Sequence, residues 1–173
     1  VLLNFIMDAR TGLGRFRNFR ISNYQLMMDL IDYCQDHNID EVLELSDVQE
    51  RVELFYDHQE RFREQLSECA RVEENVLVVD LRSQEVIYAG NRFVKYALYP
   101  QCNVSVQAMW GFKRQNVVFT VGKSIFNRTC SADVGKLMLR FGGGGHAAAG
   151  TCQIANEEAE ERLAEVVSEL KGC

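Results

Sequence analysis

A run of four glycines followed by a histidine is the part of this sequence best suited to bind a charged ligand. It reads Phe141-Gly-Gly-Gly-Gly-His146-Ala-Ala-Ala-Gly150. Glycine has no side chain over its backbone N–H group and reaches positive φ at little cost, so the run can form a tight loop whose N–H groups face an anion. The alanines are good helix formers and predict a helix whose positive end points at the same ligand. His146 adds an imidazole that titrates near physiological pH.

A flexible linker is the alternative interpretation of this run. Linkers are rich in glycine and serine, whereas Phe141 and alanines flank these glycines. A P-loop has Lys and then Ser or Thr after its last glycine, where this chain has His146. The dinucleotide fingerprint needs Gly-x-Gly-x-x-Gly inside a strand–helix–strand unit, which the flanks do not supply. We therefore predict an anion-binding loop, formed by Gly143, Gly144, Gly145 and His146, in which His146 donates to a phosphate or stacks on a base.

The charge distribution favours an anionic ligand near this loop. The whole chain has a formal net charge of −6, yet residues 91–150 hold eight Lys and Arg residues against the single acid Asp133. Such a basic segment suits a polyanion, for example a short nucleic acid. Charges spread over several faces are the alternative. Lys123, Ser124 and Arg128 are the side chains from this segment that we expect to contact phosphate.

The sequence contains no complete set of metal ligands. Phosphodiester hydrolysis in water commonly relies on two divalent ions, which need several carboxylate and His ligands close together. The three histidines stand at positions 37, 58 and 146, and there is no Asp-His-His triplet. The six cysteines form no Cys-x-x-Cys pair, which predicts free, mostly buried thiols in a reducing cytoplasm. Asp8, at the end of a predicted buried strand, remains as an isolated carboxylate that is either a ligand or simply solvated.

The segment Gly143-Gly144-Gly145-His146, with Ala148-Ala149-Gly150 after it, resembles the Gly-Gly-Gly-His loop of the domain that follows the catalytic domain in Asp-His-His (DHH) phosphoesterases. These enzymes hydrolyse phosphodiester or phosphoanhydride bonds, and they include oligoribonucleases, cyclic-dinucleotide phosphodiesterases and exopolyphosphatase-related proteins. A related domain lies at the end of alanyl-tRNA synthetases. The resemblance covers most of the chain.

The resemblance also implies roles for individual residues. In the family, the last catalytic strand ends in a metal-binding Asp directly followed by Thr-Gly. Here Ala9-Arg10 separates Asp8 from Thr11-Gly12. A phosphate-binding Arg often lies between serines where this chain has Lys123 and Ser124, and Lys lacks the two-pronged geometry of Arg. The implied cofactor of the full-length enzyme is manganese or magnesium, with no metal expected on this part alone.

Hydrophobic patterns predict an α/β fold: a mixed β-sheet flanked by helices, preceded by a long linker helix and the end of an α/β catalytic domain. Ser22, Ser46, Asp133 and Asn156 are predicted helix caps. The expected strands are 1–7, 76–80, 86–88, 104–112, 116–121 and 151–154. The expected helices are 22–37, 39–45, a long one from 46, 91–98, 134–140 and 156–171.

The expected organisation has three parts: residues 1–45 as the end of the catalytic domain, 46–72 as the linker helix and 73–173 as the substrate-binding domain. The chain starts with Val rather than Met, and we interpret it as a fragment. We expect a cytoplasmic protein without a membrane segment, whose partner is a short single-stranded nucleic acid, a nucleotide or polyphosphate. The alternatives are a nucleic-acid-binding module without hydrolase activity and a structural domain whose long helix mediates homodimer contacts.

Overall fold

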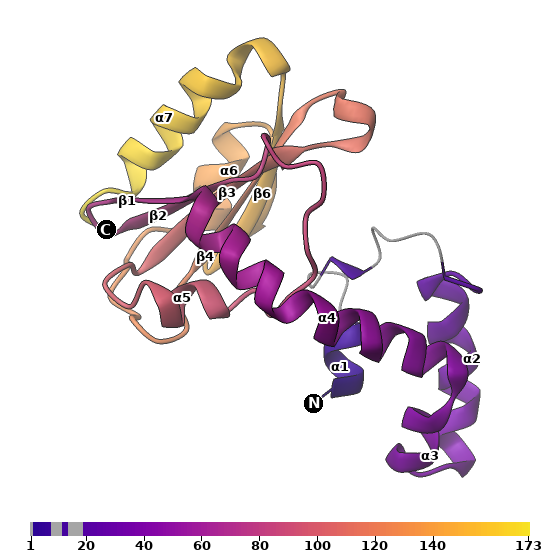
Figure 1. Ribbon diagram of the computed structural model, residues 1–173. Coiled ribbons are helices and arrows are strands. Elements are labelled where there is room, and N and C mark those ends of the chain that lie inside the picture. Colours follow the sequence, from indigo (N-terminus) through magenta and orange to yellow (C-terminus); the bar gives the residue numbers. More distant parts are fainter. Residues whose placement is uncertain (1, 8–11, 14–18) are drawn as a thin grey trace. The chain divides into compact units, whose positions relative to one another are not determined.

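The structure is a computed structural model that describes residues 2–7, 12–13 and 19–173 (Figure 1). Two compact units make up the chain. The first contains residues 1–65 and 86–92, and the second contains residues 66–85 and 93–173. Asp8, the predicted metal ligand, lies outside the described residues.

The first unit is helical in its described part. Its helices are α1 (Leu2–Met7), α2 (Asn23–Asp36), α3 (Ile39–Glu44) and most of α4 (Ser46–Cys69). Ser22 caps α2 as predicted, because its hydroxyl accepts a hydrogen bond from the Gln25 N–H group at 3.1 Å. The core of this unit includes apolar side chains from all four helices and from Ala89.

The predicted strand over residues 1–7 is wrong, since Leu2–Met7 is a helix. Short apolar runs of this kind do not distinguish a buried strand from a buried helix by periodicity. In the helix, Ile6 is fully buried and the Phe5 ring stacks on Phe55 of α4, with ring centroids 5.7 Å apart. The helix also satisfies its own backbone groups, whereas the described part of this unit offers no strand with which a strand could pair.

The second unit is built on a six-stranded mixed sheet with the order β1-β2-β3-β4-β6-β5. Its strands are β1 (Ala70–Glu73), β2 (Val76–Asp80), β3 (Val104–Trp110), β4 (Val117–Lys123), β5 (Gly144–His146) and β6 (Ala149–Ile154). Strands β2 and β3 pair in parallel, and the other neighbours pair antiparallel. This sheet confirms the predicted mixed α/β fold.

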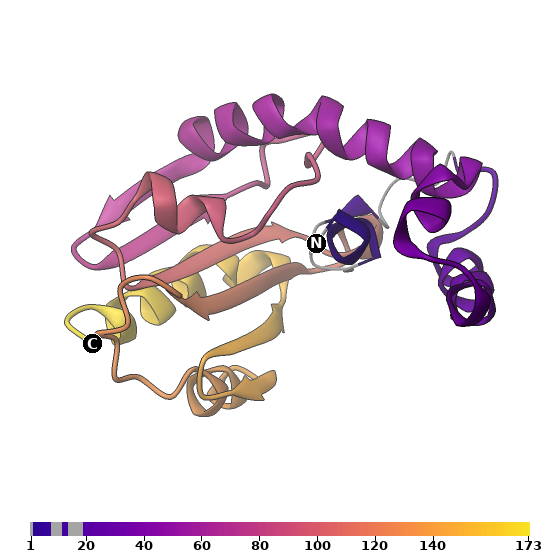
Figure 2. The same cartoon turned by 90° about the horizontal axis from the view of Figure 1, so that it is seen from below.

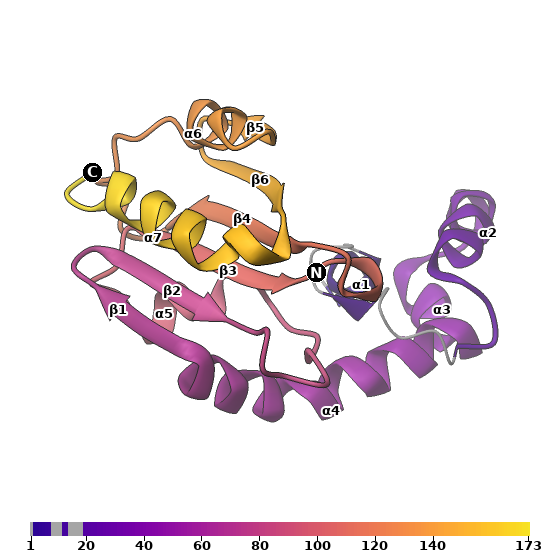
Figure 3. The ribbon, with the colours of Figure 1, turned by 90° about the horizontal axis from the view of Figure 1, so that it is seen from above.

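Helices cover both faces of this sheet. Helices α6 (Val134–Arg140) and α7 (Ala159–Leu170) pack on one face, where alternate residues of the central strands, such as Val106 and Phe119, form the core with them. The short helix α5 (Val94–Leu98) lies on the opposite face, as Figures 2 and 3 show. It belongs to the crossover that a parallel β2–β3 pair requires. Asp133 caps α6 as predicted, accepting from the Lys136 N–H group at 3.0 Å.

The predicted strand at Val86–Tyr88 is also wrong, because this segment has no strand partner. Side chains of α4 satisfy its backbone instead. Gln65 donates to the Val86 carbonyl at 2.7 Å and accepts from the Tyr88 N–H group at 3.1 Å. Such side-chain pairing replaces a β-ladder without any change in the apolar pattern, so the pattern alone misleads.

Asn156 does not cap the last helix. A 3₁₀ turn at Asn156–Glu158 precedes α7, and the Asn156 amide donates to the Arg114 carbonyl at 3.0 Å. The side chain therefore ties the start of the last helix to the β3–β4 turn. At that turn Lys113 and Arg114 both adopt positive φ, in agreement with the turn predicted at 113–115.

Candidate functional site

The glycine run forms the edge of the sheet. Gly144–His146 is strand β5, which pairs antiparallel with β6 in the register Gly144 with Thr151, Gly145 with Gly150 and His146 with Ala149. Ala147 and Ala148 are the turn between the two strands. Because β5 is the last strand of the sheet, its outer backbone edge has no further strand beside it.

The helix predicted at the three alanines is therefore wrong. A run this short cannot nucleate a helix by itself, while β6 gains a full ladder with β4 from Gly122–Ala149 to Val117–Ile154. The argument that a helix end attracts the anion falls with it. What remains is an edge strand of glycines that ends in His146.

The glycines of this strand are needed for different reasons. A Cβ atom on Gly143 would lie 2.0 Å from the Thr151 carbonyl oxygen, and one on Gly145 would lie 2.3 Å from the Ala149 carbonyl oxygen. A Cβ atom on Gly144 would meet no atom within 4 Å. The hairpin therefore requires Gly143 and Gly145 for packing, whereas the backbone at Gly144 borders open space that a ligand could occupy.

His146 is exposed, and a local hydrogen bond fixes its neutral tautomer. The Ala148 N–H group donates to Nδ1 of His146 at 3.3 Å. An Nδ1 atom that accepts a hydrogen bond leaves the proton of the neutral ring on Nε2. The imidazole consequently offers an N–H donor on its outer side without having to be charged.

Lys123 lies beside this hairpin through its backbone. Its N–H group donates to the Ala148 carbonyl at 2.9 Å. Side chains alternate along a strand, so Lys123 shares the face of Phe119 and Val121, which carries α6, while His146 shares the opposite face with Ala149. The pKa of Asp133 agrees with this placement: it is lowered by the Lys136 N–H group first, with the charges of Lys136 and Lys123 adding to it.

Ser124 and Arg128 belong to the segment that leaves β4. Ser124 is buried, and its hydroxyl accepts from the N–H groups of Phe126 and Asn127 at 3.2 and 3.1 Å. Arg128 is exposed, and its Nε donates to the Ile125 carbonyl at 3.0 Å. Thus the structure brings Lys123 and the glycine strand together, leaves Arg128 at the surface and uses the Ser124 oxygen to shape the turn.

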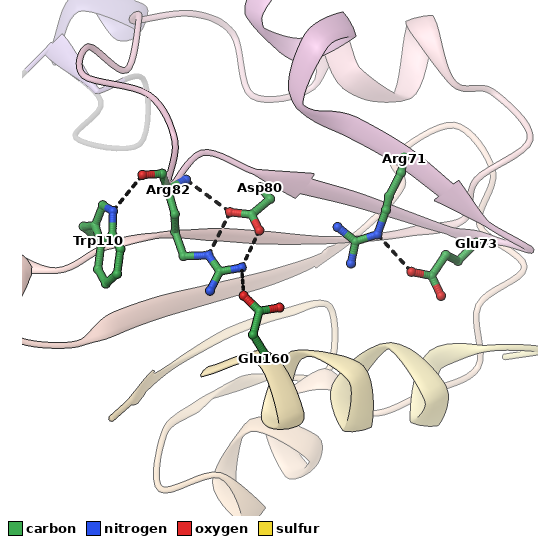
Figure 4. Close-up of polar contacts among 6 residues, drawn as sticks. All are labelled: Arg71, Glu73, Asp80, Arg82, Trp110 and Glu160. Carbon is green, nitrogen blue, oxygen red and sulfur yellow. Dashed lines mark hydrogen bonds and ion pairs between the residues drawn. The ribbon is translucent and has the colours of Figure 1, made fainter. Parts of the chain in front are cut away.

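A second polar cluster, which the sequence argument did not single out, surrounds Arg82 (Figure 4). The guanidinium donates to both oxygens of Asp80, at 2.9 and 2.5 Å, and forms an ion pair with Glu160 at 2.6 Å. Trp110 donates from its indole nitrogen to the Arg82 carbonyl at 2.7 Å. These residues line an open hollow of about 690 Å³. A polar pair at the end of a predicted strand, Asp80 and Arg82, was the available signal.

Electrostatics argue against an anion in this second cluster. Burial raises the pKa of Asp80, but the hydrogen bonds and charge of Arg82 outweigh that effect and hold it below its usual value. The same contacts raise the pKa of Arg82. Two carboxylates therefore already neutralise this arginine, and the glycine strand with His146 remains the better candidate.

Within the part of the chain that the structure describes, no three His, Cys, Asp or Glu side chains form a group that could hold a metal ion. The described residues thus do not fit the divalent ions expected for the family. No chemical step through a metal is derived from them. The described helices also include none that is long and apolar enough to cross a membrane.

Comparison with known proteins places the chain in a family through solved structures. No protein-family model matches it, and no curated protein does. A pGpG-specific phosphodiesterase, PggH from Vibrio cholerae, matches 98% of this chain with 58% sequence identity and a TM-score of 0.82. The chain belongs to the DHH family. It carries the DHH-associated domain that the Gly-Gly-Gly-His segment predicted.

Two more distant structures share the fold of this DHH-family chain. The DHH domain of a protein described as a member of a ribosomal-protein family covers 98% of the chain and 42% of its own, with 14% identity and a TM-score of 0.59. An exopolyphosphatase-related protein from Bacteroides fragilis covers 83% of the chain and 47% of its own, with 14% identity and a TM-score of 0.50. The chain spans 56% of the length of PggH.

Proposed function

We propose that this chain binds a short phosphorylated nucleotide, of the size of a linear dinucleotide, and serves as the substrate-binding part of a DHH-family phosphodiesterase. The observation that carries this proposal is the 58% identity to a pGpG-specific phosphodiesterase over 98% of the chain. Identity at this level extends to surface positions, where a fold alone imposes few constraints.

The edge strand supplies the contacts we assign to the substrate. The backbone of Gly143, Gly144 and Gly145 would hold phosphate oxygens, and the open space at Gly144 allows the closest approach. The neutral His146 ring would donate from Nε2 to the same phosphate. Each such hydrogen bond to a charged oxygen is shorter and stronger than one between neutral groups.

Basic side chains from the β4 end add attraction over a longer range. We assign this role to Lys123 and Arg128, and we assign to Ser124 the shaping of the turn that carries them, besides any contact of its hydroxyl hydrogen. The net charge of +7 over residues 91–150 raises the local concentration of an anionic substrate. Binding by such contacts weakens as salt concentration rises.

Hydrolysis itself is assigned to the metal-binding half of the enzyme. Manganese or magnesium would supply an activated hydroxide and neutralise phosphate charge. Asp8 stays a proposed ligand of that metal. The chain's own role is to bind and orient the dinucleotide, in a cytoplasmic location that its six free cysteines support.

Calorimetric titration of pGpG into the 173-residue chain tests the binding role. We expect the dissociation constant to rise at least tenfold in His146→Ala and in Gly144→Ala. His37→Ala is the matched control, since His37 is an exposed histidine at the end of α2. Affinity should also fall when salt is raised. Unchanged affinity in both site variants would contradict the assignment of the site.

A separate assay tests the division of labour. The chain is incubated with pGpG and manganese, and nucleotide products are separated by chromatography. We expect no product, because the Asp-His-His triplet is absent from this sequence. Turnover that requires manganese and stops on addition of a chelator would contradict the proposal that catalysis needs the other half of the enzyme.

A further inference from the structure

Two cysteines far apart in the sequence lie with their sulfur atoms almost at bonding distance. The Sγ atoms of Cys130 and Cys173 are 2.6 Å apart, although 43 positions separate the residues along the chain. A disulfide bond has an S–S distance of about 2.05 Å, so closing it requires a movement of only about half an ångström. Both residues belong to the second unit.

The buried side chain of Asn103 holds both cysteine-bearing segments. Its amide nitrogen donates to the Thr129 hydroxyl at 3.0 Å and to the Cys173 carbonyl at 2.7 Å. Thr129 is the residue directly before Cys130. One side chain therefore positions the segment after β4 and the segment after α7 on the same anchor.

Asn75, in the β1–β2 turn, completes this anchor. Its amide nitrogen donates to the Asn103 side-chain oxygen at 2.8 Å and to the Leu170 carbonyl at 3.0 Å, and its own oxygen accepts from the Gly172 N–H group at 2.8 Å. These contacts involve groups other than the two sulfurs. The cysteines are thus brought together by the fold, before any covalent bond forms.

We propose that Cys130 and Cys173 form a reversible thiol–disulfide site, oxidised by a low-molecular-weight disulfide such as oxidised glutathione. Geometry carries this proposal, and it goes beyond the nucleotide-binding role and does not depend on it. Of the six cysteines, only this pair has a sulfur–sulfur contact within the described residues.

The exchange proceeds in two balanced steps. Cys173, which is the more exposed of the two, attacks the glutathione disulfide as a thiolate, forms a mixed disulfide and releases one glutathione thiolate. Cys130 then gives up its proton to solvent and attacks the Cys173 sulfur, which releases the second glutathione. The two protein thiols lose two electrons, and oxidised glutathione gains them. Burial and the contact with Cys173 raise the pKa of Cys130 to about 11, which fits its place as the second thiol to react.

The disulfide would close a ring around the candidate site. The chain between the two cysteines contains α6, β5, β6 and α7, hence the whole glycine hairpin with His146. Cross-linking a loop of this length removes freedom from the unfolded chain and stabilises the folded one. We expect the melting temperature of the oxidised protein to rise by roughly 10 °C, reversibly on reduction.

Mass spectrometry of the oxidised chain tests the site without any nucleotide. The protein is equilibrated with oxidised glutathione, free thiols are blocked, and tryptic peptides are mapped. We expect a peptide that joins Cys130 to Cys173 and disappears after treatment with dithiothreitol. The melting temperature is measured on the same samples.

Matched variants separate this pair from general oxidation. Cys173→Ser and Cys130→Ala should each abolish the joined peptide and the reversible rise in melting temperature. Cys34→Ser, which removes an exposed cysteine on α2, should leave both unchanged. Only glutathione adducts at Cys130 or Cys173, or cross-links that instead involve Cys34 or Cys69, would overturn the proposal.

Discussion

Gly135 of α6 approaches Gly145 of β5 so closely that a Cβ atom on Gly135 would lie 2.9 Å from the carbonyl carbon and oxygen of Gly145. The helix thus packs directly on the backbone of the strand that ends in His146. The strand is supported by α6 on this side and by β6 within the sheet. Contact between two backbones transmits any displacement of the helix to the candidate site.

Replacing Gly135 by alanine should therefore destabilise the protein, although alanine favours helices. Forcing a methyl group into this contact is expected to lower the free energy of unfolding by about 1–3 kcal/mol. Urea unfolding measures the effect, and Leu139→Ala is the control because Leu139 is exposed on the same helix. A Gly135→Ala protein as stable as the wild type would show that the helix and strand can separate at no cost.

The two neighbouring glycines Gly143 and Gly144 should respond differently to alanine. Gly143→Ala places a methyl group against the Thr151 carbonyl and should cost about 1–3 kcal/mol of unfolding free energy. Gly144→Ala meets open space and should stay within about 0.5 kcal/mol of the wild type. Thermal and urea unfolding of the pair measures this, and equal losses would contradict the packing described for the hairpin.

Arg51 is a fully buried cation that holds the chain before α2 to α4. Its guanidinium donates to the Asn23 side chain at 2.7 Å and to the carbonyls of Asp47 and Ile21 at 2.7 and 2.6 Å. Arg51→Met should lower the free energy of unfolding by about 3–5 kcal/mol, because it leaves these buried acceptors without donors. The exposed Arg20, which pairs with Asp47, provides the control, and Arg20→Met should barely shift the urea midpoint.

His58 should make stability depend on pH. Burial lowers its pKa first, and the charge of Arg61 adds to this. The unfolded chain, with a His pKa of about 6.5, then binds more protons than the folded one, so this contribution is fully present above about pH 6.5 and is lost as pH falls below it. The Ala89 N–H group donates to Nδ1 of the neutral ring at 3.1 Å.

The measurement compares wild type with His58→Asn from about pH 7.5 to about pH 5, a range that spans the ordinary His pKa. Asparagine can accept the same hydrogen bond but does not titrate. We expect the wild type to lose stability relative to the variant by up to about 1.4 kcal/mol per pH unit in this range. Parallel pH profiles for the two proteins would contradict a neutral, buried His58.

The Arg82 cluster should matter on the acidic side. Arg82→Met removes the partner that holds the pKa of Asp80 down, and it should cost about 1–2 kcal/mol at neutral pH because Asp80 is only partly exposed. The lowered pKa means that this contribution is present above about pH 3.9 and is lost as pH falls below it. Urea midpoints of wild type and variant should therefore converge in acid. Glu160→Gln, at an 80% exposed side chain, should change little.

Local signals in the sequence were sufficient for much of the framework. Ser22 and Asp133 cap their helices through hydrogen bonds to residues three positions along, which is information contained in a single turn of chain. Alternation of apolar residues identified β2, β3 and β4 because one face of each is buried. The Gly-Gly-Gly-His segment also identified the family, which the comparison with solved structures confirmed.

By itself, then, the sequence determined the caps, the central strands, the family and the position of the candidate loop. Only the tertiary structure decided that Ala147–Ala149 would close a hairpin instead of starting a helix, that Lys123 and His146 would take opposite faces of the sheet, and that Cys130 would meet Cys173. The physical reason is range. Each of these outcomes depends on pairing or packing with segments distant in the chain, and a short local window carries no energy term for such partners.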